Sequence, residues 1–130
     1  MKNPPLRVFI VEDYPQILQG LRRYLEQCGH HVESATDLAS ARAQLRTAEV
    51  DLLISDIGLP DGDGWELMRQ LEGNGQFRAV AMSGLGGAEE IAKSKAAGFQ
   101  HHLVKPFLPN ELQPILAEAQ RLAASHEAKK

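Results

Sequence analysis

The chain has 130 residues, of which 43% are hydrophobic and 24% charged, and its formal net charge at pH 7 is -3. This length fits one domain with one hydrophobic core, and the composition excludes a disordered chain. Nucleic-acid binding is excluded because no block of lysine and arginine supplies a concentrated basic face. The one cysteine, Cys28, excludes an internal disulfide and a zinc site built from cysteines.

No membrane or export segment is indicated by the sequence. No apolar run approaches the roughly 20 residues that a membrane helix needs. The first five residues, Met-Lys-Asn-Pro-Pro, lack the apolar stretch of a signal peptide. We therefore expect a cytoplasmic protein without membrane insertion.

Short apolar runs alternate with amphipathic stretches from the start of the chain. Residues 6–11 are rich in β-branched and aromatic side chains, which predicts a buried strand. Pro15 then opens a helix that Gly29 ends. Cys28 falls on the apolar side of that helix, which predicts a buried core thiol. Residues 31–35 predict a weaker second strand.

The middle of the chain repeats this rhythm. Asp37 is a plausible N-cap for a second helix. Residues 51–55 predict the third strand. Residues 63–66 have the form of a capping box, which predicts the start of a third helix, and the Gly-Asn-Gly at 73–75 ends it.

The last third supplies two more strands. Residues 79–83 are short and uncharged, as in a central strand, and an alanine-rich helix follows and ends near Gly98. Residues 101–104 predict the final strand, and the final helix begins near Pro109 or Asn110.

These five strand–helix units predict an α/β fold, a (βα)5 doubly wound parallel sheet in the flavodoxin-like order 2-1-3-4-5. We expect a tail at residues 1–5, one domain at 6–122 and a polar tail at 123–130. In such sheets ligands bind beyond the carboxyl ends of the strands, so the candidate site is sought there.

Charged and hydroxyl side chains follow the ends of four predicted strands: Glu12, Asp13, Asp56, Ser83 and Lys105. Three carboxylates held together repel one another unless a cation is present. A hard dication with oxygen ligands, Mg²⁺ or Mn²⁺, resolves the repulsion. Asp56 could then bind the metal with one oxygen and attack phosphorus with the other.

The same residues suit phosphoryl transfer, which needs positioning and charge neutralisation more than acid–base chemistry. The metal would balance one phosphoryl oxygen and Lys105 a second. The Ser83 hydroxyl and the Gly84 N–H would bind the third.

Together these segments resemble the response-regulator receiver family of two-component signalling, over residues 6–122. The residues that carry the resemblance are Val11-Glu12-Asp13-Tyr14-Pro15, Ser55-Asp56-Ile57-Gly58-Leu59-Pro60, Asp63-Gly64, Ser83-Gly84 and Lys105-Pro106-Phe107.

The resemblance implies a role for each matching residue. Asp56 would be the phosphoacceptor for a histidine kinase or a histidine phosphotransfer domain. Glu12 and Asp13 would hold Mg²⁺ together with Asp56 and the backbone carbonyl of Gly58.

The resemblance also implies a switch. Ser83 and Lys105 would bind the phosphoryl group, and the peptide bond between Lys105 and Pro106 would be cis. At His102 the family often has a Tyr or Phe that rotates as a switch residue, so histidine is a departure. One hypothesis is that this imidazole makes activation sensitive to pH between about 5 and 8; the alternative is a partly exposed histidine on an interface.

Two further positions would tune the lifetime of the phosphoryl group. Gly58 and Leu85 bring no polar side chain to orient an attacking water, which predicts slow to moderate self-hydrolysis.

Other motifs have simpler interpretations. Asp61 and Asp63 resemble the start of a calcium loop, but Trp65 stands where an EF-hand needs Asp or Asn. His101 and His102 are adjacent on a strand, so they point to opposite faces and cannot chelate one zinc ion.

We therefore expect a phosphoacceptor switch that acts on no substrate other than its own phosphoryl group. Phosphorylation would change the surface around the last two helices, and the output would be another protein. The sequence around Asp56 and that of residues 98–106 resemble receivers of hybrid histidine kinases. A stand-alone regulator and the receiver of a hybrid kinase both stay open.

Two rivals belong to other classes. A Mg²⁺-dependent phosphatase needs a second acid two residues after its nucleophile, where Gly58 stands. A flavodoxin-like flavin carrier needs a Ser/Thr-rich loop where Glu12 and Asp13 would repel a phosphate.

Overall fold

The structure is a computed structural model that describes residues 4–71, 77–84 and 86–128. At its centre lies a sheet of five parallel strands in the order β2-β1-β3-β6-β7. The strands are β1 Arg7–Val11, β2 His31–Ala35, β3 Leu52–Asp56, β6 Arg78–Ser83 and β7 His101–Val104. The predicted fold class and flavodoxin-like strand order are confirmed.

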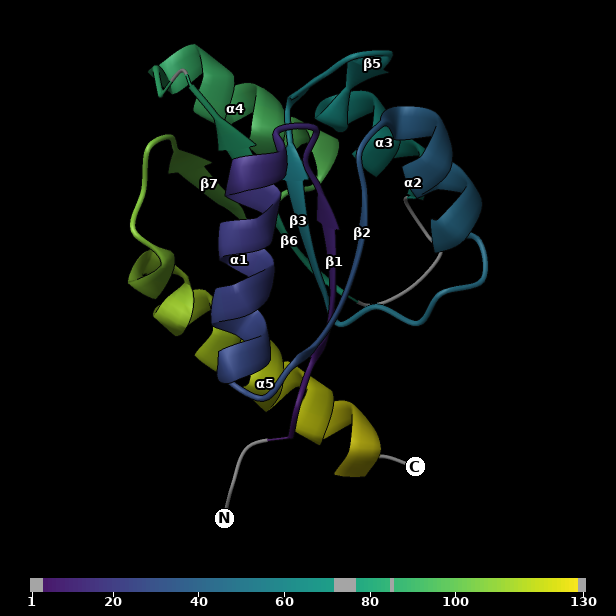
Figure 1. The fold of residues 1–130 in the computed structure, drawn as a ribbon, viewed down its shortest axis with the longest axis vertical. Helices are drawn as coiled ribbons and strands as arrows, with labels where there is room; N and C mark the ends of the chain where they lie inside the picture. The colour runs from purple at the N-terminus through teal and green to yellow at the C-terminus, as the bar shows by residue number, and fades with distance from the viewer. Residues whose placement is uncertain (1–3, 72–76, 85, 129–130) are drawn as a thin grey trace.

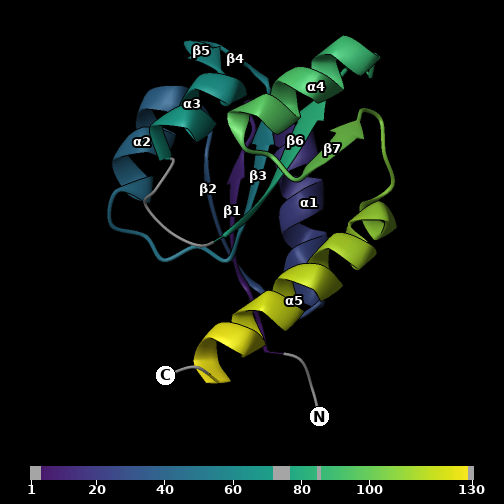
Figure 2. The same cartoon turned by 180° about the vertical axis from the view of Figure 1, so that it is seen from behind.

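Helices cover both faces of this sheet (Figures 1 and 2). Two of them, α1 Pro15–Gln27 and α5 Gln113–Ala128, lie on one face. The other three, α2 Leu38–Leu45, α3 Gly64–Leu71 and α4 Ala88–Ala97, lie on the opposite face. Such two-sided cover is the doubly wound arrangement.

The buried side chains form two hydrophobic clusters, one on each face of the sheet, and alternate residues of a strand belong to different clusters. In β1, Val8 and Ile10 pack with α1 and α5, whereas Phe9 and Val11 pack with α2 and α3. Successive side chains of a strand point to opposite faces, so each strand feeds both clusters. All five residues of β3 are buried, which explains why its sequence has no polar side chain before Ser55.

A small hairpin lies between β3 and α3. Its two strands, β4 Gly58–Leu59 and β5 Gly62–Asp63, pair in antiparallel fashion. Asp61 at its turn accepts hydrogen bonds from the backbone N–H groups of Leu38 and Ala39, at 2.7 and 3.0 Å. These bonds hold the pKa of Asp61 below its ordinary value. The residue that hinted at a calcium loop therefore satisfies the amino end of α2.

The predicted helix caps take these positions. The Asp37 carboxylate accepts from the Ser40 N–H at 2.7 Å, and that of Asp63 accepts from the Glu66 N–H at 2.8 Å. Gly98 adopts the left-handed conformation (φ 113°) that ends α4. The Gly-Asn-Gly at 73–75 that was expected to end α3 lies outside the described residues.

One local expectation differs from the structure. Cys28 is exposed rather than buried: it is the C-cap of α1 and lies at the end of the helix, not within it. At the carboxyl terminus α5 continues to Ala128, so much of the expected polar tail is helical. A 3₁₀ turn, η1 Pro109–Leu112, precedes α5.

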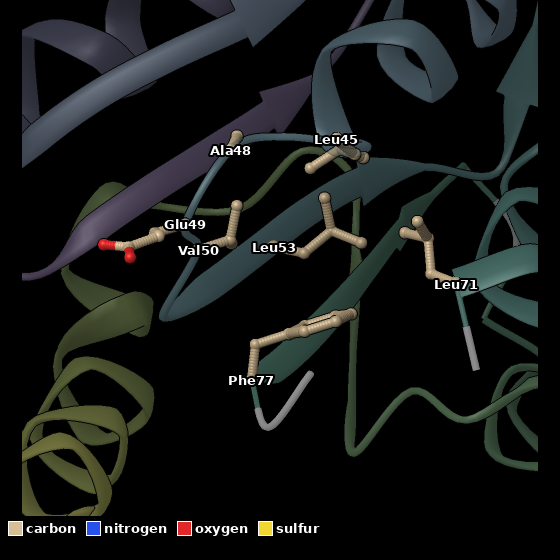
Figure 3. Close-up of a pocket in the computed structure, with 7 residues that line it drawn as sticks. All are labelled: Leu45, Ala48, Glu49, Val50, Leu53, Leu71 and Phe77. Carbon is tan, nitrogen blue, oxygen red and sulfur yellow. The ribbon is translucent and has the colours of Figure 1, made fainter. Parts of the chain in front are cut away.

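The amino ends of the strands lie at the opposite edge of the sheet from the candidate site. There a pocket is lined by apolar side chains of α2, α3, β3 and the segments beside them, including Leu45, Val50, Leu53, Leu71 and Phe77 (Figure 3). Over the described ranges, no helix combines the length and the apolar character required to cross a bilayer.

Candidate functional site

An acidic cluster lies at the carboxyl ends of β1 and β3. Glu12 and Asp13 follow β1 directly, and Asp56 is the last residue of β3. One carboxylate oxygen from each of these three residues lies within 4.8 Å of the others. The Glu12 side chain is 0% exposed and that of Asp56 10%, whereas Asp13 is exposed. The cluster is thus buried on one side and open to solvent on the other.

Lys105 joins two of these carboxylates. Its Nζ donates to Glu12 Oε1 at 2.6 Å and to Asp56 Oδ2 at 3.0 Å. Lys105 follows β7, and its backbone N–H bonds to the Ser83 carbonyl at 2.7 Å. The Lys105–Pro106 peptide bond is cis. The ends of β1, β3, β6 and β7 therefore meet in one place, as the strand order requires.

The pKa values of Glu12 and Lys105 are both raised above their ordinary values. Burial raises the pKa of Glu12, and the charge of Asp56 adds to this effect although Lys105 opposes it. For Lys105, burial lowers the pKa, but the hydrogen bonds to Glu12 and Asp56 outweigh it and raise the pKa. A raised pKa favours a bound proton on each group. The acidic surroundings therefore hold positive charge, as a proton on Glu12 or as the ammonium form of Lys105.

The donor set fits a hard dication. Carboxylate oxygens are the ligands that Mg²⁺ takes, and it keeps several waters, which the exposed side at Asp13 allows. Glu12 is wholly buried, and its charge is compensated by a single ammonium group that Asp56 shares. A cluster with three carboxylates and one ammonium is left with excess negative charge, which a dication would neutralise.

The backbone around Asp56 is fixed by close packing. The Ile57 N–H donates to the Met82 carbonyl at 2.9 Å, and the Gly64 N–H to the Ile57 carbonyl at 2.8 Å. A Cβ at Gly64 would lie 2.4 Å from the carbonyl oxygen of Asp56, a distance that no real side chain tolerates. Glycine at 64 therefore lets α3 begin directly against the end of β3.

The remaining predicted residues surround this cluster. Ser83 ends β6 and is buried, and its Oγ lies 2.9 Å from His102 Nε2. Gly58 begins β4, is exposed, and has open space where a Cβ would stand. Leu85 lies outside the described residues, so the prediction that rests on Leu85 and Gly58 stays a prediction.

Sequence reasoning missed two residues beyond His102: Ser94, which contacts its ring, and Trp65, which contacts Ser94. His102 Nδ1 lies 2.8 Å from Ser94 Oγ, and the Trp65 Nε1–H donates to the same oxygen at 3.0 Å. A signal was present: Ser94 stands three residues after Ile91 and three before Ala97, on the apolar side of α4. A serine at an apolar helical position must find polar partners inside the protein.

The sequence model of the response regulator receiver domain family matches residues 8–117 of this chain. The chain belongs to this family. The KDP operon transcriptional regulatory protein KdpE of Escherichia coli K12 is 40% identical over 117 residues, which cover 88% of this chain and 51% of that protein. The sensor protein EvgS of the same strain is 31% identical over 119 residues, which cover 91% of this chain and 10% of that protein. The receiver domain thus spans about half the regulator and a small part of the sensor.

Solved structures agree with this assignment. The chemotaxis response regulator CheY4 of Vibrio cholerae superposes with a TM-score of 0.82 at 28% identity, over 89% of this chain and 99% of that chain. The receiver fold observed here therefore accounts for almost the whole of that solved chain.

Proposed function

We propose that this receiver domain takes a phosphoryl group onto Asp56 from the phosphohistidine of a histidine kinase or a histidine phosphotransfer domain. The observation that carries the proposal is the ammonium group of Lys105, which touches both Glu12 and Asp56 inside a cluster of three carboxylates. The Asp56 side chain, which is 10% exposed, thus lies among cationic and acidic groups. Such positioning is what phosphoryl transfer requires of a protein.

Each residue has a distinct role in the transfer. A carboxylate oxygen of Asp56 attacks phosphorus, the P–N bond to the donor imidazole breaks, and its electron pair stays on the imidazole nitrogen. Lys105 then moves its hydrogen bonding from the carboxylates to a phosphoryl oxygen, and the Ser83 hydroxyl donates to another. Glu12 and Asp13, with Asp56 and the carbonyl of Gly58, would hold Mg²⁺ or Mn²⁺. The bound dication supplies neutralisation of the charge on the phosphoryl oxygens.

Signalling follows if the phosphoryl group binds one arrangement of the domain better than another. The surface that we expect to respond comprises α4, β7 and α5, because Ser83 and Lys105 flank β7. Val104, at the end of β7, is 42% exposed, and it is an apolar side chain that an output protein could cover. Both alternatives stay open: the match to nearly all of CheY4 supports a stand-alone regulator, and the match to a small part of the sensor protein EvgS supports the receiver part of a hybrid histidine kinase. The cytoplasmic location inferred from the sequence stays a prediction.

The test is phosphorylation by acetyl phosphate in Mg²⁺, followed by intact mass. The parent should gain the mass of one phosphoryl group, and Asp56→Asn should gain none. Asp51→Asn is the matched control: Asp51 lies at the amino ends of the strands, where it accepts from the Arg7 N–H at 2.8 Å, and asparagine keeps that acceptor. It should take up the phosphoryl group like the parent. No gain in the parent, or an equal gain in Asp56→Asn, would refute the proposal.

A further inference from the structure

A chain of hydrogen bonds leads from the candidate site through α4 to α3. It runs from Ser83 Oγ to His102 Nε2 at 2.9 Å, from His102 Nδ1 to Ser94 Oγ at 2.8 Å, and from Ser94 Oγ to Trp65 Nε1 at 3.0 Å. The four residues belong to β6, β7, α4 and α3. They connect the site to the contact between α3 and α4, where Lys93 Nζ lies 5.4 Å from the centroid of the Trp65 ring.

The direction of the hydrogen bonds in this chain follows from Ser94. The Trp65 indole N–H is only a donor, so Ser94 Oγ accepts from it. Ser94 is 1% exposed, and its hydroxyl hydrogen needs an acceptor. Among the described residues the one acceptor in contact with it is His102 Nδ1. The hydroxyl of Ser94 therefore donates to Nδ1.

This assignment determines the tautomer of a neutral His102. With Nδ1 accepting, the ring proton resides on Nε2, and Nε2–H donates to Ser83 Oγ. Ser83 then accepts from the ring and uses its own O–H toward another oxygen. The opposite tautomer would make Ser83 the donor to His102 and would turn its hydrogen away from the phosphoryl site.

We propose that Ser94 and His102 are positioning residues, which orient the Ser83 hydroxyl as a donor to the phosphoryl group and transmit its state to the indole of Trp65. The proposal rests on the proposed function of Asp56. When the Ser83 hydroxyl binds a phosphoryl oxygen, the bond from His102 changes its geometry. The hydrogen bonds of Ser94 and then of Trp65 change their geometry in turn, because each of these side chains is hydrogen-bonded to the next.

Trp65 makes the proposal measurable, because it is the one tryptophan of the sequence. Its indole N–H gives a single resonance in a ¹⁵N–¹H spectrum, and ring ¹⁵N shifts report the tautomer of His102. At about pH 8, where histidine is ordinarily neutral, the parent should show the Nε2–H tautomer. On addition of Mg²⁺ and beryllofluoride, which mimics the phosphoryl group, the indole resonance should shift.

Ser94→Ala separates this chain from general packing. The variant keeps the helix but removes the oxygen that joins Trp65 to His102. The indole resonance should no longer respond to beryllofluoride. The affinity for beryllofluoride should fall about 2- to 10-fold, the size expected for one neutral hydrogen bond. Ser40→Ala, at an exposed position of α2, is the control and should behave as the parent.

Three outcomes would overturn the proposal. The first is the Nδ1–H tautomer in the parent, which stays measurable even if Ser94→Ala does not fold. The second is an unchanged indole response in folded Ser94→Ala, and the third is an unchanged affinity. Failure of the proposed function looks different, because the parent would then take up no phosphoryl group by intact mass.

Discussion

The two ends of the central sheet bury ionisable side chains under opposite conditions. At the carboxyl ends, Glu12 is wholly buried and touches the ammonium group of Lys105 at 2.6 Å. At the amino ends, His30 is 7% exposed, and its Nδ1 accepts the Leu6 N–H at 2.9 Å. A charge is compensated at the first end, and a neutral group is required at the second.

The difference shows in the direction of the pKa shifts. Burial raises the pKa of Glu12, and contact with the carboxylates raises that of Lys105 against the effect of burial, so positive charge is retained there. Burial lowers the pKa of His30, and the neighbouring His31 adds to this effect, so positive charge is excluded. The end that attracts cations is the end at which the candidate site lies.

The largest expected change in stability comes from the amino ends of the strands, where the apolar pocket lies. Leu53 is 0% exposed and lines the pocket of Figure 3. Leu53→Ala should lower the free energy of unfolding by about 3–4 kcal/mol, because a cavity is left among side chains that relax only partly. Mg²⁺ should stabilise this variant by the same increment as the parent, since ligand binding to the native state is unchanged. Urea unfolding with and without Mg²⁺ measures both quantities.

The next prediction removes the charge compensation at the other end. Lys105→Met leaves Glu12 and Asp56 without their shared ammonium group. In EDTA its free energy of unfolding should fall by about 2–3 kcal/mol, less than for a fully buried pair, since Lys105 is partly exposed and Glu12 can take up a proton. Unlike Leu53→Ala, this variant should gain more from Mg²⁺ than the parent does, because no ammonium group competes for the carboxylates. An equal increment in both variants would contradict the proposed distinction between the two ends.

The sequence predicted the arrangement of the strands and the position of the site together, because both follow from backbone periodicity. The strands at 31–35 and 101–104 were predicted at their observed bounds, and the other three within one residue. Glu12, Asp56 and Lys105 could be brought together in advance, because the carboxyl ends of parallel strands meet at one edge. No side-chain conformation had to be known.

What escaped prediction depends on side chains or on where an element ends. The contacts of Ser94 with His102 and Trp65 depend on rotamers of three elements, which no local pattern specifies. The hairpin at 58–63 pairs only two residues on each strand, and the Asp61 carboxylate at its turn reaches the start of another helix. Cys28 was assigned to the core from its helical phase, but it is the C-cap at the end of α1 and is exposed.

A smaller change in stability is expected when the close contact between Gly64 and the backbone of Asp56 is altered. In Gly64→Ala the new methyl group would meet the Asp56 carbonyl at 2.4 Å, so the backbone must shift. We expect a loss of about 2 kcal/mol in the free energy of unfolding and slower phosphorylation by acetyl phosphate. Gly20→Ala is the control: nothing lies within 4 Å of its Cβ, and it should gain about 0.5–1 kcal/mol. Stability of Gly64→Ala equal to the parent would show that α3 does not restrain Asp56.

The smallest effect concerns the neutral histidine and appears only as a dependence on pH. Because the pKa of His30 is lowered in the folded state, the unfolded chain binds the extra proton first. Its contribution to stability is therefore complete above about pH 6.5, the ordinary value, and is lost as the pH falls below it. His30→Asn keeps an acceptor near the Leu6 N–H but cannot titrate. Between about pH 6.5 and 5, the free energy of unfolding of the parent should fall more steeply than that of the variant, by at most about 1.4 kcal/mol per pH unit. The difference between the two curves cancels the other histidines and the opposite trend of Glu12, so parallel curves would mean that folding does not lower the pKa of His30.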